Sequence, residues 1–339
     1  MKKFIRIGID LAKNYFQIHA LTSEDGPPVT RKLRRSKMLE FFAQIEPCRI
    51  GMEACGSAHY WARELKALGH DVLLLPPAYT KPYVKRGKND AVDADAICEA
   101  MSRPGMRFVP VKSEESQAAL MLHKTRELLV KQKTMSVNAL RGHLAEFGII
   151  AAKGIGRVDE LIELAEKDAT LPSTARAGIK VLAQSLEGID KAISDLDDEI
   201  TGTQTEMTQL LLEVPGIGKL IASAIVTSVP DPGVFKSGRD FSAWLGLVPR
   251  QHSSGGKPTL GAITKQGNRY IRKLLVLGAT SLLKAVGKRK GALRDFIAAL
   301  LARKPARLVT VALANKLARI VLAMMKTGES FRAETFAKI

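Results

Sequence analysis

The sequence is poor in cysteine and in aromatic side chains, and it lacks a long apolar run. Its three cysteines, Cys48, Cys55 and Cys98, form no Cys-x-x-Cys pair, which argues against a disulfide framework and a thiolate zinc site and fits a reducing cytoplasm. No run approaches the roughly 18 apolar residues of a membrane span, and Arg6 and Asp10 interrupt the N-terminus too early for a signal peptide. Aromatic residues make up 5% of the chain, so binding by extensive base stacking is not indicated.

Acidic residues are scarce in one part of the chain only. The net charge of +18 arises from 52 Lys and Arg against 34 Asp and Glu. Residues 1–112 have 19 basic and 12 acidic side chains, residues 113–213 have 11 and 17, and residues 214–339 have 22 and 5. A solvated surface does not need such segregation, whereas a phosphate-binding surface does. The charge therefore makes a polyanion the first partner to consider.

The first 112 residues alternate between strand and helix patterns, which predicts an α/β domain. Alternating or continuous apolar residues predict strands at 4–10, 16–21, 29–33, 49–53 and 72–75. Helices are expected after the N-cap residues Ser36, Ser57 and Asn89, the last of them over residues 90–102. A basic loop before that last helix provides candidate nucleic-acid contacts, Lys85, Arg86 and Lys88.

The middle third, residues 113–213, has a helical pattern. From Leu182 to Leu210, eight of nine positions at a 4-3 spacing are apolar, which predicts a coiled-coil seam within a helix over 179–213. At ~1.5 Å per residue that helix would span roughly 50 Å. A second helix over 114–147 could pack antiparallel to it. An internal hairpin stalk and a dimerisation arm both fit this pattern, and we favour dimerisation.

Four carboxylates lie at the ends of predicted strands or at the start of a predicted helix, which are common positions for catalytic residues. Asp10 and Glu53 each end a predicted strand, while Asp90 and Asp93 lie three residues apart at a helix start and so share a face. An acidic residue at a helix start often only complements the helix dipole, but an aspartate that ends an apolar strand is costly to bury alone. Oxygen ligands of this kind suit a pair of Mg²⁺ ions, which keep positions for phosphate and water. In a chain that binds nucleic acid, the set predicts phosphodiester cleavage.

The order of these carboxylates resembles the ribonuclease H-like fold of Holliday-junction resolvases. In that fold the first aspartate is on the first strand, a glutamate is on the fourth, and two further carboxylates open a late helix. The matching segments are Gly8-Ile9-Asp10, Met52-Glu53-Ala54 and Asn89-Asp90-Ala91-Val92-Asp93-Ala94. The resemblance implies an α/β ribonuclease H-like domain over residues 1–112.

The C-terminal part, residues 214–339, is predicted to be mainly helical, and it contains several glycine-rich turns that suit phosphate binding. Val214-Pro215-Gly216-Ile217-Gly218, followed by Lys219, resembles a helix-hairpin-helix, in which backbone N–H groups approach a DNA phosphate. A plain tight helix connection explains the same motif. Asn268 can cap a helix that begins with Arg269 and Arg272, which would place cations and free N–H groups at one helix start.

Ser254 lies in a glycine-rich loop among basic residues. The loop and its surroundings provide further candidate phosphate contacts, Arg250, Lys257 and Lys265. A serine hydroxyl is a weak nucleophile until a base or a metal takes its proton, and a serine beside glycines is most often a turn residue. The residues alone therefore leave the role of Ser254 open.

The ordered motifs together resemble the DEDD transposases of bacterial insertion sequences, specifically the bridge-RNA-guided recombinases. The resemblance covers essentially the whole chain: D, E and D-x-x-D, then a coiled coil, then V-P-G-I-G, G-L-x-P and S-G-G-K…K-x-G-N-x-x-R. It implies that Asp10, Glu53, Asp90 and Asp93 hold Mg²⁺, and that Ser254 attacks the scissile phosphate. The family's serine directly precedes the glycine, so the role falls on Ser254 and not on Ser253.

The same resemblance implies the partners. They are double-stranded DNA of the element ends and target, a noncoding guide RNA, and further copies of the chain in a dimer or a pair of dimers. A cytoplasmic, nucleoid-associated protein without membrane contact is expected. The metal site and the serine lie in separate predicted domains, so they could meet between protomers.

Two other functions fit part of the sequence. A Mg²⁺-dependent junction resolvase or nuclease would use water as its nucleophile, and it would not need the C-terminal part with Ser254. A non-enzymatic nucleic-acid-binding protein would not need the carboxylates, which weaken phosphate binding unless a metal is present. The full set of motifs favours the recombinase.

Overall fold

The computed structural model describes the chain except for residues 1–2, 85–89, 253–258, 289–290 and 334–339. The chain divides into two compact units, Met1–Glu114 and Glu115–Ile339. Each unit has its own apolar core.

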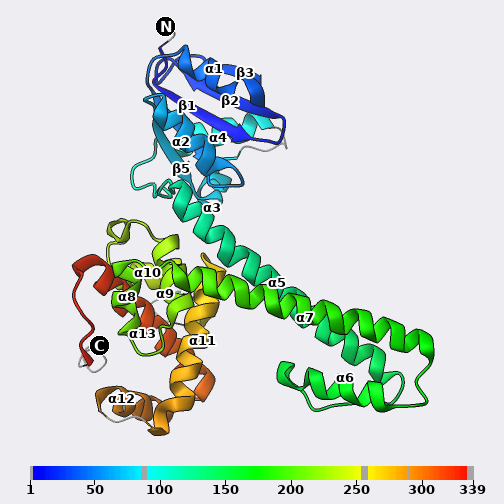
Figure 1. Ribbon diagram of the computed structural model, residues 1–339. Coiled ribbons are helices and arrows are strands. Elements are labelled where there is room, and N and C mark those ends of the chain that lie inside the picture. The colour runs from blue at the N-terminus through cyan, green and yellow to red at the C-terminus, as the bar shows by residue number, and fades with distance from the viewer. Residues whose placement is uncertain (1–2, 85–89, 253–258, 289–290, 334–339) are drawn as a thin grey trace. The chain divides into compact units, whose positions relative to one another are not determined.

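The first unit is built on a mixed five-stranded sheet with the order β3-β2-β1-β4-β5 (Figure 1). Strand β2 is antiparallel to both of its neighbours, β1 and β3, whereas β1, β4 and β5 run parallel to one another. The strand bounds are Arg6–Leu11, Tyr15–Leu21, Val29–Arg34, Arg49–Glu53 and Asp71–Leu75. The expected strands are thus confirmed, with ends that differ by one or two residues.

Alternation along the strands produces the core of this unit. Successive side chains of a strand point to opposite faces of the sheet, so alternate residues such as Ile7 and Ile9 share one face. Both are fully buried, as is Ile18 of β2. They pack with Phe16 and Trp61, whose rings meet edge to face at 5.2 Å between centroids. The sequence pattern therefore fixes which residues form the interior.

Four helices complete the first unit: α1 (Met38–Ala43), α2 (Ala58–Ala67), α3 (Pro77–Thr80) and α4 (Asp90–Ala100). Of the expected caps, Ser36 is wrong, and Ser57 is confirmed in position but not as a side-chain cap. A 3-10 turn over Arg35–Lys37 precedes α1, so Ser36 does not begin that helix. Ser57 stands before α2 with φ 66°, and its side chain makes no capping hydrogen bond. The expected cap Asn89 lies outside the described residues.

The second unit contains a helical hairpin made of α5 (Glu114–Ala145) and α7 (Ser173–Gly202), and the chain that connects them includes α6 (Val158–Lys167) at the outer end of the hairpin (Figure 1). Arg126 pairs with Asp197, and Lys133 pairs with Asp190. The two pairs lie seven residues apart on each helix, and the residue numbers rise along α5 as they fall along α7. The two helices are therefore antiparallel. The internal hairpin is therefore present within one chain, and dimerisation stays a prediction.

The expected single helix over 179–213 is wrong at its C-terminal end. Helix α7 ends at Gly202, and α8 (Glu206–Leu212) begins after a break. The side chain of Thr205 accepts a hydrogen bond from the backbone N–H of Thr208 and so caps α8. The apolar spacing continues across this break, which is why the sequence did not reveal it.

The remaining elements pack around a core of apolar helix faces. They are α9 (Lys219–Ser228), α10 (Gly238–Trp244), α11 (Arg269–Ala285), α12 (Ala292–Leu301), α13 (Ala306–Thr327) and the short strands β6 (Pro249–Gln251) and β7 (Leu260–Ile263). The expected cap of α11 is confirmed, since the Asn268 side chain accepts hydrogen bonds from the N–H groups of Tyr270 and Ile271, both at 3.1 Å.

Helix α13 has the length and composition of a membrane span, contrary to the expectation that no stretch would reach it. It has 22 residues, and its most apolar window has a mean hydropathy of 1.7. However, 67% of that window is buried inside the protein. Lys316 on this helix is itself buried, with its ammonium 4.7 Å from the centroid of the Phe296 ring. The helix is the centre of the second unit's core.

Candidate active site at the carboxyl edge of the sheet

Asp10 and Glu53 are positioned by two neighbouring parallel strands. In the register of β1 and β4, Ile9 lies opposite Met52, so the two acidic residues follow at the same end of the sheet. Ligands of open sheets with parallel strands bind at this carboxyl end. Both carboxylates also act on one thiol: partial burial, followed by the charges of Glu53 and Asp10, raises the pKa of Cys55. The two acids therefore share one place, as the sequence predicted.

Glycine allows α4 to lie directly on the sheet. A Cβ at Gly8 would stand 2.2 Å from the carbonyl oxygen of Ala94 and 2.7 Å from the backbone nitrogen of Cys98. A Cβ at Gly51 would meet the sulfur of Met101 at 2.7 Å. At Gly8 the obstacle is the backbone of α4, so only glycine permits this approach of the helix to β1, whereas at Gly51 the obstacle is the Met101 side chain.

The direction of α4 brings its acidic end toward the same edge. Met101 and Ser102, just beyond its C-terminus, line a pocket with Arg6 and Arg49 at the N-terminal ends of β1 and β4. The N-terminus of α4 therefore points to the carboxyl ends of these strands. Asp93 is half-buried and lies one helical turn before the buried Ile97, so it belongs to the side of the helix that faces the sheet.

Glu53 is held by a buried neighbour. The Thr80 hydroxyl, at the end of α3 and 1% exposed, donates a hydrogen bond to the Glu53 carboxylate. Sequence reasoning missed Thr80, because nothing in the residues around it indicates which strand end it would meet. Asp95, two residues after Asp93 on α4, lies 3.5 Å from the His19 side chain of β2.

The structure brings Asp10 and Glu53 to one edge of the sheet, and the metal site stays a prediction. Within the described part of the chain, no group of three or more His, Cys, Asp or Glu side chains is close enough to hold a metal ion. Helix α4 includes Asp90, but the side chain of that residue is not described. Ser254 and four predicted phosphate contacts lie outside the described residues: Lys85, Arg86, Lys88 and Lys257.

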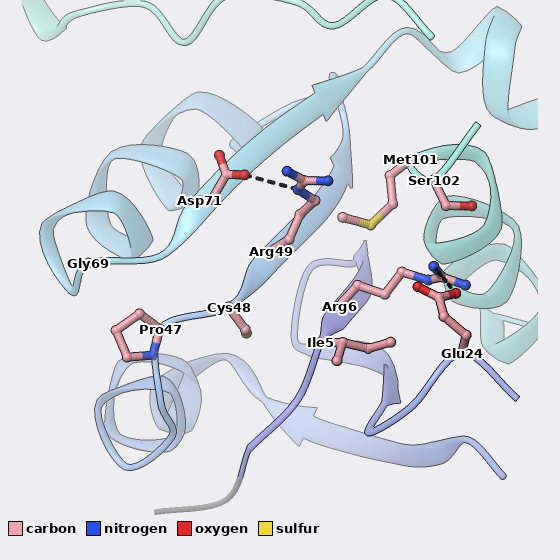
Figure 2. A pocket seen from close by; sticks show the side chains of 10 residues that line it. All are labelled: Ile5, Arg6, Glu24, Pro47, Cys48, Arg49, Gly69, Asp71, Met101 and Ser102. Carbon is pink, nitrogen blue, oxygen red and sulfur yellow. Dashed lines mark hydrogen bonds and ion pairs between the residues drawn. The ribbon is translucent and has the colours of Figure 1, made fainter. Parts of the chain in front are cut away.

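A pocket of about 610 Å³ opens at the opposite edge of the sheet, and its charges are already paired (Figure 2). Arg49 bonds to Asp71 at 3.0 Å, and Arg6 bonds to Glu24 at 2.6 Å. It lies at the N-terminal ends of the parallel strands, where sheets of this type do not bind their ligands. This pocket is therefore not the candidate active site.

In the second unit, the predicted hairpin joins α8 to α9, and its two glycines have different surroundings. Gly216 has φ 89°, and its carbonyl oxygen packs against Gly278 of α11. Gly218, by contrast, is exposed beside the exposed Lys219, and a Cβ added to it would meet no atom of another segment within 4 Å. Gly216 therefore serves packing, whereas Gly218 and Lys219 are open to a phosphate.

The described residues on either side of the Ser254 segment form a two-stranded antiparallel ribbon, β6 and β7. Arg250 on β6 is exposed, and its guanidinium reaches the Thr264 carbonyl at 3.5 Å. Lys265 is also exposed and has φ 57°. The candidate nucleophile thus belongs to the connection between two short strands with cations at their base.

A basic groove of about 800 Å³ lies where α11 begins beside α5. Its lining includes Asn268, Arg269 and Lys273 of the predicted cradle, together with Lys124 and Lys131 of α5. The two α5 lysines were missed, because they belong to residues 113–213, where acidic side chains outnumber basic ones. Arg272 instead points inward and donates to the carbonyls of Leu245 and Gln266, at 2.7 and 2.8 Å.

Comparison with known proteins agrees with these features. A family model described as a DEDD transposase matches residues 7–149, and one described as "Transposase IS116/IS110/IS902 family" matches residues 208–294. The chain is 47% identical to a putative transposase, y4pF/y4sB, of Sinorhizobium fredii over 98% of this chain and 87% of the relative. It is 45% identical to a probable family 20 transposase of Pseudomonas aeruginosa, over 96% and 98%. It is 37% identical to the transposase for insertion sequence element IS1111A of Coxiella burnetii, over 98% and 92%.

The carboxylates at the sheet edge and these matches define the protein as a transposase, an enzyme that cleaves DNA and transfers its strands. The chain belongs to the IS110/IS116 family of insertion-sequence transposases, whose DEDD domain has a ribonuclease H-like fold. The mixed α/β sheet of the first unit agrees with that assignment.

Proposed function

We propose that this transposase excises and inserts its own element through a covalent serine–DNA intermediate. The observation that supports the proposal most is the common edge of the first unit, toward which Asp10, Glu53 and the N-terminus of α4 are directed. Ser254 joins this set by its motif, which lies between β6 and β7 in the part of the chain that is richest in positive charge.

The donor set fits a hard divalent cation, because carboxylate oxygens are the ligands that Mg²⁺ prefers. Asp10, Glu53, Asp90 and Asp93 would hold the metal, which we take to be two Mg²⁺ ions. When bound, Mg²⁺ offsets negative charge on phosphate oxygens and favours ionisation of a hydroxyl. Thr80 keeps the Glu53 carboxylate oriented by its hydrogen bond, and the pairing of β1 with β4 fixes the spacing of Asp10 and Glu53.

The serine step conserves bond energy. The Ser254 oxygen forms a bond to the scissile phosphorus while one phosphoester bond of the DNA breaks, and the departing DNA oxygen takes up a proton. One phosphoester thus replaces another, so attack by a second DNA hydroxyl can restore the strand and free the serine without ATP.

We assign residues 1–112 to the catalytic ribonuclease H-like domain, 113–213 to the coiled-coil stalk, and 214–339 to the basic transposase domain. The partners are double-stranded DNA of the element ends and target, and a noncoding guide RNA that pairs with them. Exposed Gly218, Lys219, Arg250 and Arg269 support phosphate contacts in the basic domain. A cytoplasmic, nucleoid-associated protein follows from such partners.

We further propose that two stalks associate, and that dimers pair. Met121, Leu128 and Met135 recur every seven residues on α5, and their side chains are 64%, 54% and 61% exposed. An apolar stripe at heptad spacing on a long helix is typical of a helix–helix contact. Assembly would also allow the carboxylates of one protomer to act with Ser254 of another.

The test of the serine step is a denaturing gel of labelled element-end DNA incubated with the full-length protein, guide RNA and Mg²⁺. Wild type and Ser253→Ala should give a protein-linked DNA end, whereas Ser254→Ala should bind DNA and give none. The neighbouring serine is the matched control, since both changes remove one hydroxyl from the same loop.

The outcomes separate the alternatives. Linkage kept by Ser254→Ala but lost by Ser253→Ala would move the nucleophile by one residue. Cleavage by all three proteins without any linked species would mean that water is the nucleophile, as in a junction resolvase. Binding without cleavage by the wild type under all metal conditions would contradict an enzymatic role for the carboxylates.

A further inference from the structure

A cavity of about 770 Å³ lies at one corner of the sheet, and none of its lining residues belongs to the carboxylate site. Three cations line it, Lys13, Arg34 and Arg35, together with three aromatic residues, Tyr15, Tyr60 and Trp61. Asn14 and Ser36 complete the lining, and no carboxylate takes part. Cations and aromatic rings in one cavity are the combination that binds phosphate and base of a nucleotide.

The topology places this cavity on the catalytic edge. Strands β1 and β3 are both antiparallel to β2, so they run parallel to each other, and the end of β3 at Arg34 lies on the same edge as Asp10. One strand separates the two, which corresponds to about 10 Å at the usual strand spacing. Stacked DNA rises ~3.4 Å per nucleotide along each strand. A strand whose phosphate lies at Asp10 would therefore reach the cavity within about three nucleotides.

The cations of the cavity are not neutralised by the protein. Among the described residues, no ion pair involves Lys13, Arg34 or Arg35. Arg35 instead stacks on aromatic rings, with its guanidinium carbon 5.1 Å from the Trp61 centroid and 5.7 Å from that of Phe16. Stacking orients the guanidinium without neutralising its charge, so that charge can still pair with an anion.

The aromatic residues divide into a support and a contact surface. Trp61 is 4% exposed, and its indole N–H is buried with no hydrogen-bond partner in the described chain. A buried N–H without a partner is uncommon, and here the ring serves as the platform under Arg35. Tyr15 and Tyr60 are 41% and 40% exposed. The Lys32 ammonium lies 4.9 Å from the centroid of the Tyr15 ring, so an unstacked base would contact the Tyr60 ring and the part of the Tyr15 ring that Lys32 leaves exposed.

The cations near β3 have a second possible role, which is to prevent the exposed edge of the sheet from pairing with another chain. An edge strand such as β3 commonly has charged residues that prevent pairing with another chain, and this explains Arg31 and Lys32, which do not line the cavity. It does not explain Lys13 of the β1–β2 connection or Tyr60 of α2, which lie on other elements. Exposed aromatic rings would also work against such protection.

We propose that this cavity holds an unpaired nucleotide of the DNA strand being cleaved, next to the nucleotide at the carboxylates. The phosphate contacts Lys13, Arg34 and Arg35, and the base rests against Tyr15 and Tyr60. The inference rests on the proposed function, because the position of the DNA strand follows from a scissile phosphate at Asp10 and Glu53.

The test uses full-length protein in a chelating buffer without Mg²⁺, so that binding is measured apart from cleavage. The probe is a labelled 20-nucleotide single-stranded DNA of the element end, with duplex DNA and single-stranded RNA of the same sequence as the other arms. Arg34→Ala and Tyr60→Leu should each weaken single-stranded DNA binding about five- to tenfold, the scale of one lost stacking or phosphate contact. They should change duplex and RNA binding less than twofold.

Two controls match these variants. Lys37→Ala removes an exposed cation that directly follows the lining residue Ser36 but does not line the cavity and is already paired with Glu40. Phe147→Leu removes an aromatic ring of similar exposure in the second unit. Both should bind single-stranded DNA as the wild type does. Arg34 is fully at the surface, so its variant keeps the test valid if Tyr60→Leu does not fold.

A crosslinking arm locates the nucleotide. The photoreactive base 5-iododeoxyuridine, placed one to three nucleotides from the cleavage position, should crosslink to Tyr15 or Tyr60.

Wild-type affinity in both cavity variants without such crosslinks would overturn the inference, even in a protein that cleaves normally. Equal losses on RNA and DNA would overturn its assignment to the cleaved strand. Lost affinity with these crosslinks, in a protein whose Asp10→Asn variant still cleaves, would instead refute the proposed catalytic role while leaving the cavity's binding role intact.

Discussion

At the scale of single residues, the catalytic edge depends on charge at a few positions and on the absence of side chains at others. Asp10 and Glu53 occupy paired strand ends, whereas Gly8 and Gly51 make room for the helix that contains Asp93. These two requirements fail in different ways. Loss of a carboxylate changes chemistry in an intact fold, whereas a side chain at Gly8 displaces the helix.

Asp10→Asn and Asp93→Asn should each abolish strand cleavage and keep nucleic-acid binding, because each change removes a ligand charge while preserving the shape of the side chain. Cleavage of element-end DNA with Mg²⁺ and guide RNA measures the first property, and a mobility shift measures the second. Asp71→Asn is the control, since Asp71 pairs with Arg49 at the opposite edge. Wild-type cleavage by Asp10→Asn would eliminate the metal-site assignment.

Gly8→Ala should lower the free energy of unfolding by about 1–3 kcal/mol, the usual cost of overpacking, and reduce cleavage strongly. The new Cβ meets the backbone of α4, which cannot yield as a flexible side chain would. Thermal and denaturant unfolding measure the loss. Gly56→Ala is the matched control, because a Cβ there meets no atom within 4 Å. Equal stability of the two variants would show that α4 does not pack as described.

At the scale of elements, one buried histidine joins three helices of the second unit. The two ring nitrogens of His123 on α5 lie 3.1 Å from the Tyr270 hydroxyl of α11 and 3.1 Å from the Ser223 hydroxyl of α9. Burial, followed by the charge of Arg126, lowers the pKa of His123 to about 4. Burial likewise raises the pKa of Tyr270 to about 12. The junction is therefore neutral at physiological pH.

The second unit should lose stability as the pH falls from about 6.5 to about 4. In that window the unfolded chain, with an ordinary histidine pKa of 6.5, binds a proton that folded His123 excludes. The unfolded state is thus stabilised on acidification, by up to about 3 kcal/mol for the full shift. Denaturant unfolding at several pH values measures this, and the difference between wild type and His123→Gln isolates it from carboxylate titration. Identical pH profiles of the two proteins would contradict it.

Replacement of the apolar stripe on α5 should dissociate the proposed stalk contact. Leu128→Lys and Met135→Lys place charges at exposed positions, so the chain should fold while association weakens by at least about tenfold per site if the stripe is a buried contact. Light scattering during size-exclusion chromatography gives the oligomeric state. Val181→Lys on α7, an apolar residue of similar exposure, should leave it unchanged. A wild-type protein that is monomeric at high concentration would refute the contact.

The sequence predicted elements whose signals are local. The strands follow from alternation, and the cap of α11 follows from Asn268. The break between α7 and α8 was not predictable, because Thr203 and Thr205 interrupt the helix while the apolar spacing continues. Likewise, Thr80 and the cavity beside β3 depend on which distant elements meet. Spacing in one sequence does not give that information.

At the scale of the whole molecule, charge and packing divide the chain together near residue 114, but charge alone divides it again near residue 214. Charge changes sign near residues 113 and 214, whereas the compact units meet at Glu114 and Glu115. The core of the second unit continues past residue 214, since Leu211 packs in the same cluster as Val214, and His123 bonds to Tyr270. The charge distribution depends on which partners each part of the chain binds, whereas the extent of a core depends on which segments pack together. The sequence therefore showed the charge boundary near residue 214, but not that one core extends across it.

Binding of RNA and DNA by the full-length chain should weaken steeply with salt, because each phosphate contact releases counterions. A plot of log affinity against log salt should have a slope of about −0.9 for each phosphate neutralised on duplex DNA. Arg269→Ala should make the slope shallower by about one contact. Lys167→Ala, at an exposed lysine already paired with Glu163, is the control. A flat plot would refute the role assigned to the basic C-terminal part.

The contact of Gly8 with α4 also bears on how copies of a mobile element decay in a genome. Every single-base change in the first two positions of a glycine codon that does not create a stop codon introduces a side chain. At Gly8 that side chain would meet the Ala94 backbone, so a copy can be silenced while its four acidic codons and its serine codon remain intact. Whether a genomic copy can still move is therefore judged from this glycine codon as well as from the catalytic codons.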